Sequence, residues 1–230
     1  MFFHRTYERC AIPADRQMLA GRWRVEAPNA STDSFFIGRT YYRPMPDRHG
    51  PTAALGVGGG LAACVAAGFG YAALTGPIGA VRTIHVWVGT AWTALVLAYG
   101  FVLAPLLRER DTAAAYPIVA RLAPTTLVLL PTLTVVTLAA GVTMALAYGI
   151  VWPMTTLVRA VFGVAVAIAG IALLGVLPAD VLTYRELRSA DPDPERVVSL
   201  GVRTATLLTV QGALQVTMLF LMLRVAAMTG

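Results

Sequence analysis

The sequence predicts an all-α membrane protein, a bundle of five transmembrane helices with the N-terminus inside and the C-terminus outside. The chain of 230 residues is 57% hydrophobic and 13% charged, with a mean hydropathy of +0.68, whereas a soluble domain carries about 25% charged residues. Its apolar residues form five long blocks, and its arginines gather on one side of them. These observations together indicate a multi-pass protein of the cell (plasma) membrane.

Residues 1–50 form a polar tail that is rich in Arg and Pro and lacks the apolar core of a signal peptide. Two interpretations remain open for this tail. It is disordered, as its composition favours, or translation starts at Met45 and residues 1–44 are never made. Residues 51–230 are then the five-helix transmembrane domain.

Each apolar block reaches the ~20 residues that cross a hydrocarbon core of ~30 Å. The predicted segments are Thr52 to Thr75, Ala80 to Leu107, Leu122 to Tyr148, Thr155 to Leu177 and Leu200 to Met228. Between them we expect breaks at residues 76–79 and 149–153, and polar loops at residues 108–121 and 180–196. Similar polar loops after the second and fourth segments hint at a duplicated helical pair.

The orientation follows from the arginines, because basic residues stay on the cytoplasmic side. On the side of the tail stand Arg43, Arg48, Arg108, Arg110, Arg121, Arg185, Arg188, Arg196 and Arg203. The opposite side has Arg82, Arg159 and Arg224. This asymmetry predicts an N-in, C-out topology.

The sequence lacks the residues that several classes of function require. The arginines form no basic stripe with interleaved aromatics, which argues against nucleic acid as a partner. Cys10 and Cys64 belong to no metal or disulfide motif. Asp180 and Glu186 are expected in the inner loop, so that no acid lies among the helices to serve hydrolysis or a carboxylate relay. The sequence therefore favours a protein that is not an enzyme.

His85 is the one histidine inside a long apolar stretch, and an ionisable ring in a membrane indicates function. At helical spacing it shares a stripe with Arg82, Gly89, Trp92 and Tyr99. Gly89 leaves a notch into which another helix or the edge of a flat ligand fits. The alternative is that His85 joins two helices by a hydrogen bond and Trp92 fills the core.

Arg82, His85 and Trp92 resemble one helix of the bacterial membrane-bound protoporphyrinogen oxidase family and of the copper-resistance D-like membrane proteins and their uncharacterised relatives. The oxidase resemblance implies a haem or porphyrin bound by His85, with Arg82 facing a propionate and Trp92 in the same cofactor site. A second intramembrane histidine is absent from the sequence. The other axial ligand would then be Met, water or a group of another subunit.

The copper-resistance resemblance implies a copper site instead. Imidazole and thioethers suit Cu(I), and His85 with Met218 and Met222 is the predicted metal-binding set. These methionines and Met144, Met154 and Met228 all map to the outer half of the bundle. Methionine also fills irregular apolar gaps, which is the alternative interpretation.

Polar and small residues within the other segments predict helix packing. Gln211 and Gln215 are expected to bond the face of the third segment formed by Thr134, Thr137 and Gly141, or else to line a substrate path. The first interpretation is favoured because no carboxylate accompanies the amides. Gly56 and Gly60 form a Gly-x-x-x-Gly face for close packing, and Pro131 should kink the third segment.

The predicted function is the binding or transport of a small ligand or a copper-type metal, without enzymatic activity. A haem- or porphyrin-linked redox protein that uses His85 is the first alternative. A structural partner subunit of a membrane complex is the second. The predicted partners are the lipid bilayer and either a second copy of the chain or another membrane subunit.

Overall fold

A computed structural model describes residues 51–229, so the two interpretations of the N-terminal tail lie outside the described residues. Within this range the chain forms five helical spans that are long and apolar enough to cross a membrane. The predicted all-α architecture and number of spans are thus confirmed. The spans are Thr52–Thr75, Ile78–Glu109, Thr112–Ala147, Thr156–Leu187 and Pro194–Ala227.

Two of the spans are composite. The second consists of α2 (Ile78–Leu97), a π-helical segment η1 (Ala98–Leu103) and α3 (Ala104–Glu109). The fourth consists of α5 (Thr156–Gly170), a second π-helical segment η2 (Ile171–Val176) and α6 (Leu177–Leu187). The remaining spans are the single helices α1 (Pro51–Thr75), α4 (Thr112–Ala147) and α7 (Pro194–Thr229).

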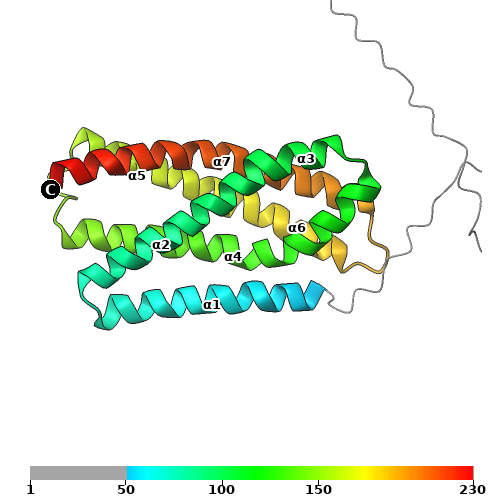
Figure 1. Ribbon diagram of the computed structural model, residues 1–230, viewed down its shortest axis with the longest axis horizontal. Coiled ribbons are helices and arrows are strands. Elements are labelled where there is room, and N and C mark those ends of the chain that lie inside the picture. Colours follow the sequence, from blue (N-terminus) through cyan, green and yellow to red (C-terminus); the bar gives the residue numbers. More distant parts are fainter. Residues whose placement is uncertain (1–50, 230) are drawn as a thin grey trace, which may run out of the picture. The chain divides into compact units, whose positions relative to one another are not determined.

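The helices run roughly side by side along the length of the bundle, as Figure 1 shows. α1 lies along α4 at one edge, and α2 crosses the bundle obliquely from the α1 side towards α7. α4 packs against α1, α2, α6 and α7, which makes it the central helix of the described domain. Residues that α4, α6 and α7 direct towards one another are therefore shielded from lipid.

Each π-helical segment precedes a proline, Pro105 in the second span and Pro178 in the fourth. A π turn shifts the hydrogen-bond register by one residue, and this irregularity accommodates a residue that has no N–H to donate. The helix therefore continues past each proline. The same order of helix, π-helical segment and helix recurs in both spans.

The predicted break at residues 149–153 is confirmed, and the break predicted at 76–79 is confined to Gly76 and Pro77, because α2 begins at Ile78. The two polar loops are much shorter than predicted. α3 ends at Glu109 and α4 begins at Thr112, with the Asp111 carboxylate accepting a hydrogen bond from the Ala114 N–H at 2.9 Å. α6 ends at Leu187 and α7 begins at Pro194. A helix that leaves the hydrocarbon can expose charged side chains to water, so charge alone does not end it.

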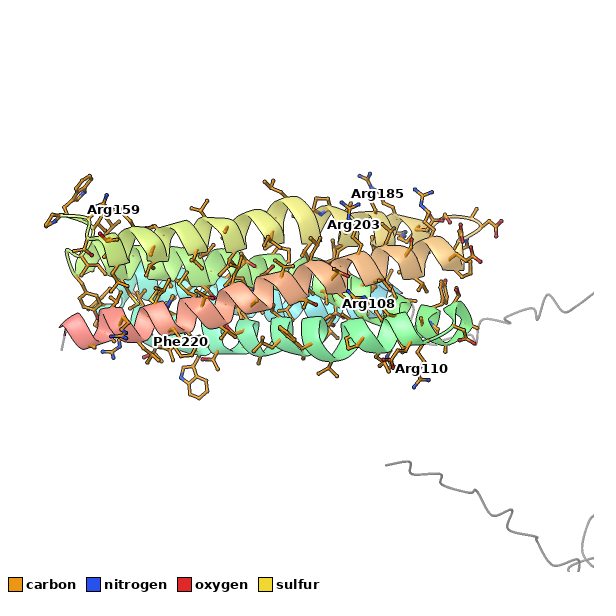
Figure 2. The ribbon with its side chains drawn as sticks, turned by 90° about the horizontal axis from the view of Figure 1, so that it is seen from above. Arg108, Arg110, Arg159, Arg185, Arg203 and Phe220 are labelled. Carbon is orange, nitrogen blue, oxygen red and sulfur yellow. The ribbon has the colours of Figure 1, made fainter. Side chains whose placement is uncertain are left out.

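These extensions pack into a cluster of their own at one end of the bundle, formed by Ala104, Leu107, Ala115, Val119, Val197 and Ala205. Figure 2 shows Arg108, Arg110, Arg185 and Arg203 gathered towards the same end, with Arg159 at the opposite end. On α7 the helical rise between Arg203 and Arg224 is about 31 Å, the thickness of a hydrocarbon core. We call the first end the arginine-rich end. Which side of the membrane it faces stays a prediction.

α4 is one continuous helix although Pro117, Pro124 and Pro131 lie inside it. The kink predicted at Pro131 thus produces no break in the helix. In a membrane bundle, neighbouring helices and hydroxyl side chains can satisfy the carbonyl groups that a proline leaves without a donor.

Candidate functional site: a buried carboxylate at the arginine-rich end

Asp180 lies inside the bundle, where its side chain is 3% exposed. The prediction that Asp180 belongs to an inner loop is therefore wrong, as is the prediction that no acid lies among the helices. The physical reason is that the fourth span does not end before Pro178 but continues through η2 and α6 to Leu187. Asp180 then falls on the same helical face as Val176 and Thr183, which are both buried. Glu186, also expected in the inner loop, lies in the last turn of α6 next to that loop and is half-buried.

One oxygen of this carboxylate is held across two helices, and the other is not. The Thr204 hydroxyl on α7 donates to Oδ1 of Asp180 at 3.1 Å. Oδ2 is buried and has no hydrogen-bond partner among the described residues. A buried acceptor without a donor costs free energy, and intramembrane acids commonly mark ion or proton sites.

A cavity of about 30 Å³ adjoins the carboxylate. That is room for one or two water molecules or a small ion. The cavity wall combines apolar side chains of the second, third and fifth spans with hydroxyl groups. It consists of Tyr99, Leu103, Leu107, Val119, Leu122, Ala123, Thr126, Asp180, Thr183, Gly201, Thr204 and Ala205.

Three threonine hydroxyls of the wall donate to acceptors of the protein and keep oxygen lone pairs. Thr126 Oγ1 donates to the carbonyl of Ala123 at 3.1 Å, and Thr183 Oγ1 donates to the carbonyl of Ala179 at 2.9 Å. The Thr204 hydrogen points to Asp180 itself. A hydroxyl that has donated its hydrogen still has lone pairs. The cavity is therefore rich in acceptors and suits a cation or a hydrogen-bond donor.

The arginines of this end do not neutralise Asp180. Arg203 is exposed beside Thr204 on α7, and Arg108 donates to the Thr206 hydroxyl at 2.7 Å. Within residues 51–229, the salt bridge joins Nε of Arg196 to Oε2 of Glu186, which are 3.3 Å apart. Asp180 thus takes part in no ion pair in the described domain.

His85 lies in the other half of the bundle, half-buried against α4. Its Nδ1 is 2.9 Å from the carbonyl oxygen of Thr137. A carbonyl can only accept, so Nδ1 must carry the hydrogen, and Nε2 has the lone pair of the neutral ring. A Cβ on Gly141 would lie 3.1 Å from Cε1 of His85, so the ring rests on this glycine.

The residues of the stripe predicted on the second span have different surroundings in the structure. Gly89 faces α4, where an added Cβ would lie 3.3 Å from Cγ2 of Thr137, so another helix fills the notch. Trp92 is 4% exposed within the core cluster of Val96, Leu130, Leu133, Ile168, Val176 and Leu208. Tyr99 lines the cavity at Asp180, while Arg82 is exposed.

The two predicted methionine ligands are half-buried on α7. Met218 packs against the cluster that contains Trp92, whereas the contacts that position His85 are with α4. The described residues contain no group of three or more His, Cys, Asp or Glu side chains that could hold a metal. The predicted set of His85, Met218 and Met222 stays a prediction.

Gln211 and Gln215 are buried as expected, 1% and 3% exposed. The predicted hydrogen bonds to α4 are not formed, because Oε1 of Gln211 and both polar atoms of the Gln215 amide have no partner in the described domain. The Thr134 hydroxyl donates instead to the carbonyl of Leu130 in its own helix at 2.9 Å. Thr137 Oγ1 is also buried without a partner.

Asp180, Thr204, Thr126 and Thr183 are the site residues that sequence reasoning missed. A signal for Asp180 exists in the spacing of Ile168, Ala172 and Val176, which are buried on one face of the fourth span. Continued by one turn, this face reaches Asp180. Ending the segment at Leu177, before a proline, concealed it.

Comparisons with protein-family models, with curated proteins and with solved structures find no match to this chain. The function is therefore argued from the chemistry of the site.

Proposed function

We propose that this multi-pass membrane protein binds a small monovalent cation between its helices, as part of a transport function without enzymatic chemistry. The observation that supports the proposal is the buried Asp180 carboxylate, whose Oδ2 has no partner and whose cavity is lined by oxygen lone pairs. Such a charge is costly within a membrane bundle unless a cation or a proton compensates it.

The charge and the ligand type define the class of cation. Asp180 is the acid that lines this cavity, so one positive charge balances it, and a divalent ion would leave a buried positive charge unpaired. Carboxylate, hydroxyl and carbonyl oxygens are hard ligands that suit hard cations and not Cu(I). A volume of about 30 Å³ admits a proton on a water molecule, or sodium or potassium after dehydration.

The position of the site supports transport over a purely structural role. Asp180 lies about 10 Å along α6 from its end at Leu187, close enough to the arginine-rich surface to exchange an ion with the aqueous phase. Beyond it, towards the opposite end, α7 continues with buried amides at Gln211 and Gln215. The prediction that these amides serve packing was based on the absence of a carboxylate, and Asp180 removes that argument.

The experiment is thermal unfolding of the purified full chain in detergent, in sodium chloride, potassium chloride or N-methyl-D-glucamine chloride at equal ionic strength and over a pH series. N-methyl-D-glucamine is too large for the cavity. We expect sodium, potassium or protons to raise the Tm, since a ligand at 100 times its Kd stabilises by ~2.7 kcal/mol. Asp180→Asn should abolish this response.

Asp191→Asn is the matched control, because it makes the same chemical change at an exposed residue. It should respond to each cation as the wild type does. The proposal fails if wild type and Asp180→Asn show the same Tm response to all salts and to pH. A response shared by Asp191→Asn and lost in Asp180→Asn supports the site.

A second candidate function, metal binding at His85, is favoured by one observation. The hydrogen bond from Nδ1 to the Thr137 carbonyl is the arrangement that orients a metal-binding histidine and leaves Nε2 for the ion. We propose Met218 or Met222 as the further ligand for copper. The filled notch at Gly89 makes a haem less suited to this stripe than a single ion.

The visible spectrum and a Cu(I) titration of the purified protein test this candidate. A Soret band that disappears in His85→Ala would indicate haem. A colourless protein whose Tm rises with Cu(I), and does not rise in His85→Ala, would indicate copper. The absence of both responses would exclude His85 as a metal or haem ligand.

A further inference from the structure

We infer that the bundle conducts protons across the membrane along a chain of buried polar groups that runs from Asp180 to His85. The inference rests on the proposed function, since Asp180 is its cation site, and it adds the identity of the cation and the route. The groups of the chain come from α2, η1, α4, α6 and α7, and each one except His85 is buried or lines the cavity at Asp180.

The first part of the route lies between Asp180 and the middle of α7. Tyr99 lines the cavity at Asp180, and the carbonyl of the next residue, Gly100, accepts a hydrogen bond from the Thr209 hydroxyl at 2.7 Å. The second span and α7 are thus in contact at Thr209, which precedes Gln211 by two residues on α7. Oε1 of Gln211 is buried there without a partner.

The second part lies between Gln215 and His85. Gln215 is buried on α7 between Leu214 and Met218, which pack against the cluster that contains Trp92. Nε1 of Trp92 and Oγ1 of Thr137 are both buried without a partner. The Thr137 carbonyl then accepts the hydrogen bond of His85, which completes the route.

The spacing of these groups suits water molecules as bridges. Along α7 the helical rise is about 10 Å from Thr204 to Gln211 and about 6 Å from there to Gln215. One water bridges two polar groups that are too far apart for a direct bond, and two or three waters span the longer step. Each unpartnered atom on the route needs a donor or an acceptor, and water supplies both.

A proton fits this route better than a metal ion does. Trp92, Gln211 and Gln215 are at most 4% exposed. A sodium or potassium ion would need several oxygen ligands at every step. A proton moves along hydrogen bonds, so a single file of waters held by amides and hydroxyls is sufficient.

The ends of the route take up and release the proton. At Asp180 a hydronium ion gives its proton to Oδ2, which forms a carboxylic acid and leaves water. The next water on the route then takes this proton and restores the carboxylate. At the far end Nε2 of His85 takes the proton from the hydronium ion that the route delivers, which forms imidazolium and leaves water, and later gives it to an outer water molecule. Throughout, the Nδ1 hydrogen stays on Nδ1 and is donated to the Thr137 carbonyl.

Few other charges act on these two groups. Tyr99 is the other titratable residue that lines the cavity at Asp180. Arg82 lies one turn from His85 on the same helix and is exposed. Thr137 and Gly141, which α4 presents to His85, are uncharged.

Proteoliposomes of the full chain test the inference. The vesicles contain the pH dye pyranine, and valinomycin with a potassium gradient sets the membrane potential. We expect the wild type to admit protons at least about tenfold faster than protein-free vesicles, and Asp180→Asn to fall to the protein-free rate. Gln215→Leu should lower the protein-dependent rate about tenfold. Losing one hydrogen-bonding step raises the free-energy barrier by roughly the amount that slows a rate about tenfold.

Gln215→Leu has a second readout that separates conduction from structure. It replaces the amide and the waters that bridge it with an apolar side chain of similar size, so the Tm should stay constant or rise while the proton rate falls. An amide that served packing would lower the Tm when removed. The control is Thr217→Val, because this exposed threonine on α7 donates to the Ala213 carbonyl of its own helix; its proton rate should equal that of the wild type.

Two results would overturn the route. One is a wild-type proton rate equal to that of protein-free vesicles, and the other is a faster rate that Asp180→Asn and Gln215→Leu leave unchanged. If the cation response of the Tm depends on Asp180 and no flux is found, the cation site stands and the route fails. If the Tm shows no such response and no flux is found, both proposals fail.

Discussion

The Thr204 hydroxyl donates to Oδ1 of Asp180 at 3.1 Å and thereby joins α7 to α6 inside the bundle. This bond holds the carboxylate in one orientation, so that Oδ2 and not Oδ1 is the atom without a partner. Arg203, the residue before Thr204, is exposed. A threonine thus positions the acid and a small cavity beside it.

Thr204→Val should destabilise the protein and weaken its response to cations. The change removes the donor to a buried carboxylate, which costs about 1–3 kcal/mol. Thr204→Ser keeps the hydroxyl and should retain most of the stability and the response. Thermal unfolding in detergent measures both effects, and a Thr204→Val protein as stable as the wild type would contradict the bond.

Gly58→Ala and Gly60→Ala should have opposite effects on stability. A Cβ on Gly58 would lie 2.8 Å from the backbone oxygen of Thr125, so α1 would have to move away from α4. A Cβ on Gly60 meets nothing within 4 Å, and alanine there gains up to about 1 kcal/mol of helix propensity. We expect the Tm to fall in the first variant and to stay constant or rise in the second.

This pair also corrects the predicted packing face of the first span. Gly56 and Gly60 are exposed, whereas Gly58 is buried. Gly56 and Gly60 thus have the Gly-x-x-x-Gly spacing, but they do not lie in the contact with α4. Equal Tm changes for Gly58→Ala and Gly60→Ala would contradict the contact with Thr125.

The neutral ring of His85 should be the Nδ1–H tautomer. The carbonyl of Thr137 accepts from Nδ1, which excludes the Nε2–H tautomer while the bond lasts. Nitrogen NMR of protein with labelled histidine measures the tautomer, and His85→Gln assigns the signal among the three histidines. A neutral ring protonated at Nε2 would show that the bond to Thr137 is absent.

Gly141→Ala should alter the same signal. The added methyl carbon would lie 3.1 Å from Cε1 of His85, so the ring must shift. The tautomer should then lose its preference for Nδ1–H, because the bond to Thr137 lengthens. Gly163→Ala is the control, since a Cβ there meets nothing within 4 Å, and its histidine spectrum should match that of the wild type.

The arginine-rich end is predicted to face the cytoplasm, which places the C-terminus outside. Alkaline phosphatase fused to the C-terminus should then be active in bacterial cells, and a green fluorescent protein fused there should stay dark. Fusions after Asp191, in the short turn between α6 and α7, should give the reverse result. A fluorescent C-terminal fusion would contradict the N-in, C-out topology.

The five spans could be predicted from the sequence because hydrocarbon thickness sets a length of about 20 apolar residues for each crossing helix. This is a property of each segment alone, and so are the breaks at residues 76–79 and 149–153. The burial of Gln211 and Gln215 follows in the same way, since amides within an apolar segment avoid lipid. Helical spacing placed His85, Gly89 and Trp92 on one face, but it did not identify the neighbour that each one contacts.

The burial of Asp180 depends on the tertiary structure. A residue near the end of a span lies in water or inside the bundle according to whether its helix continues and which helices cover it. Here the fourth span continues past Pro178 through η2 and α6, and Thr204 and Thr126 from two other helices enclose the carboxylate. Local hydrophobicity determines that a helix crosses the membrane, whereas the packing of distant segments determines which polar groups meet inside it.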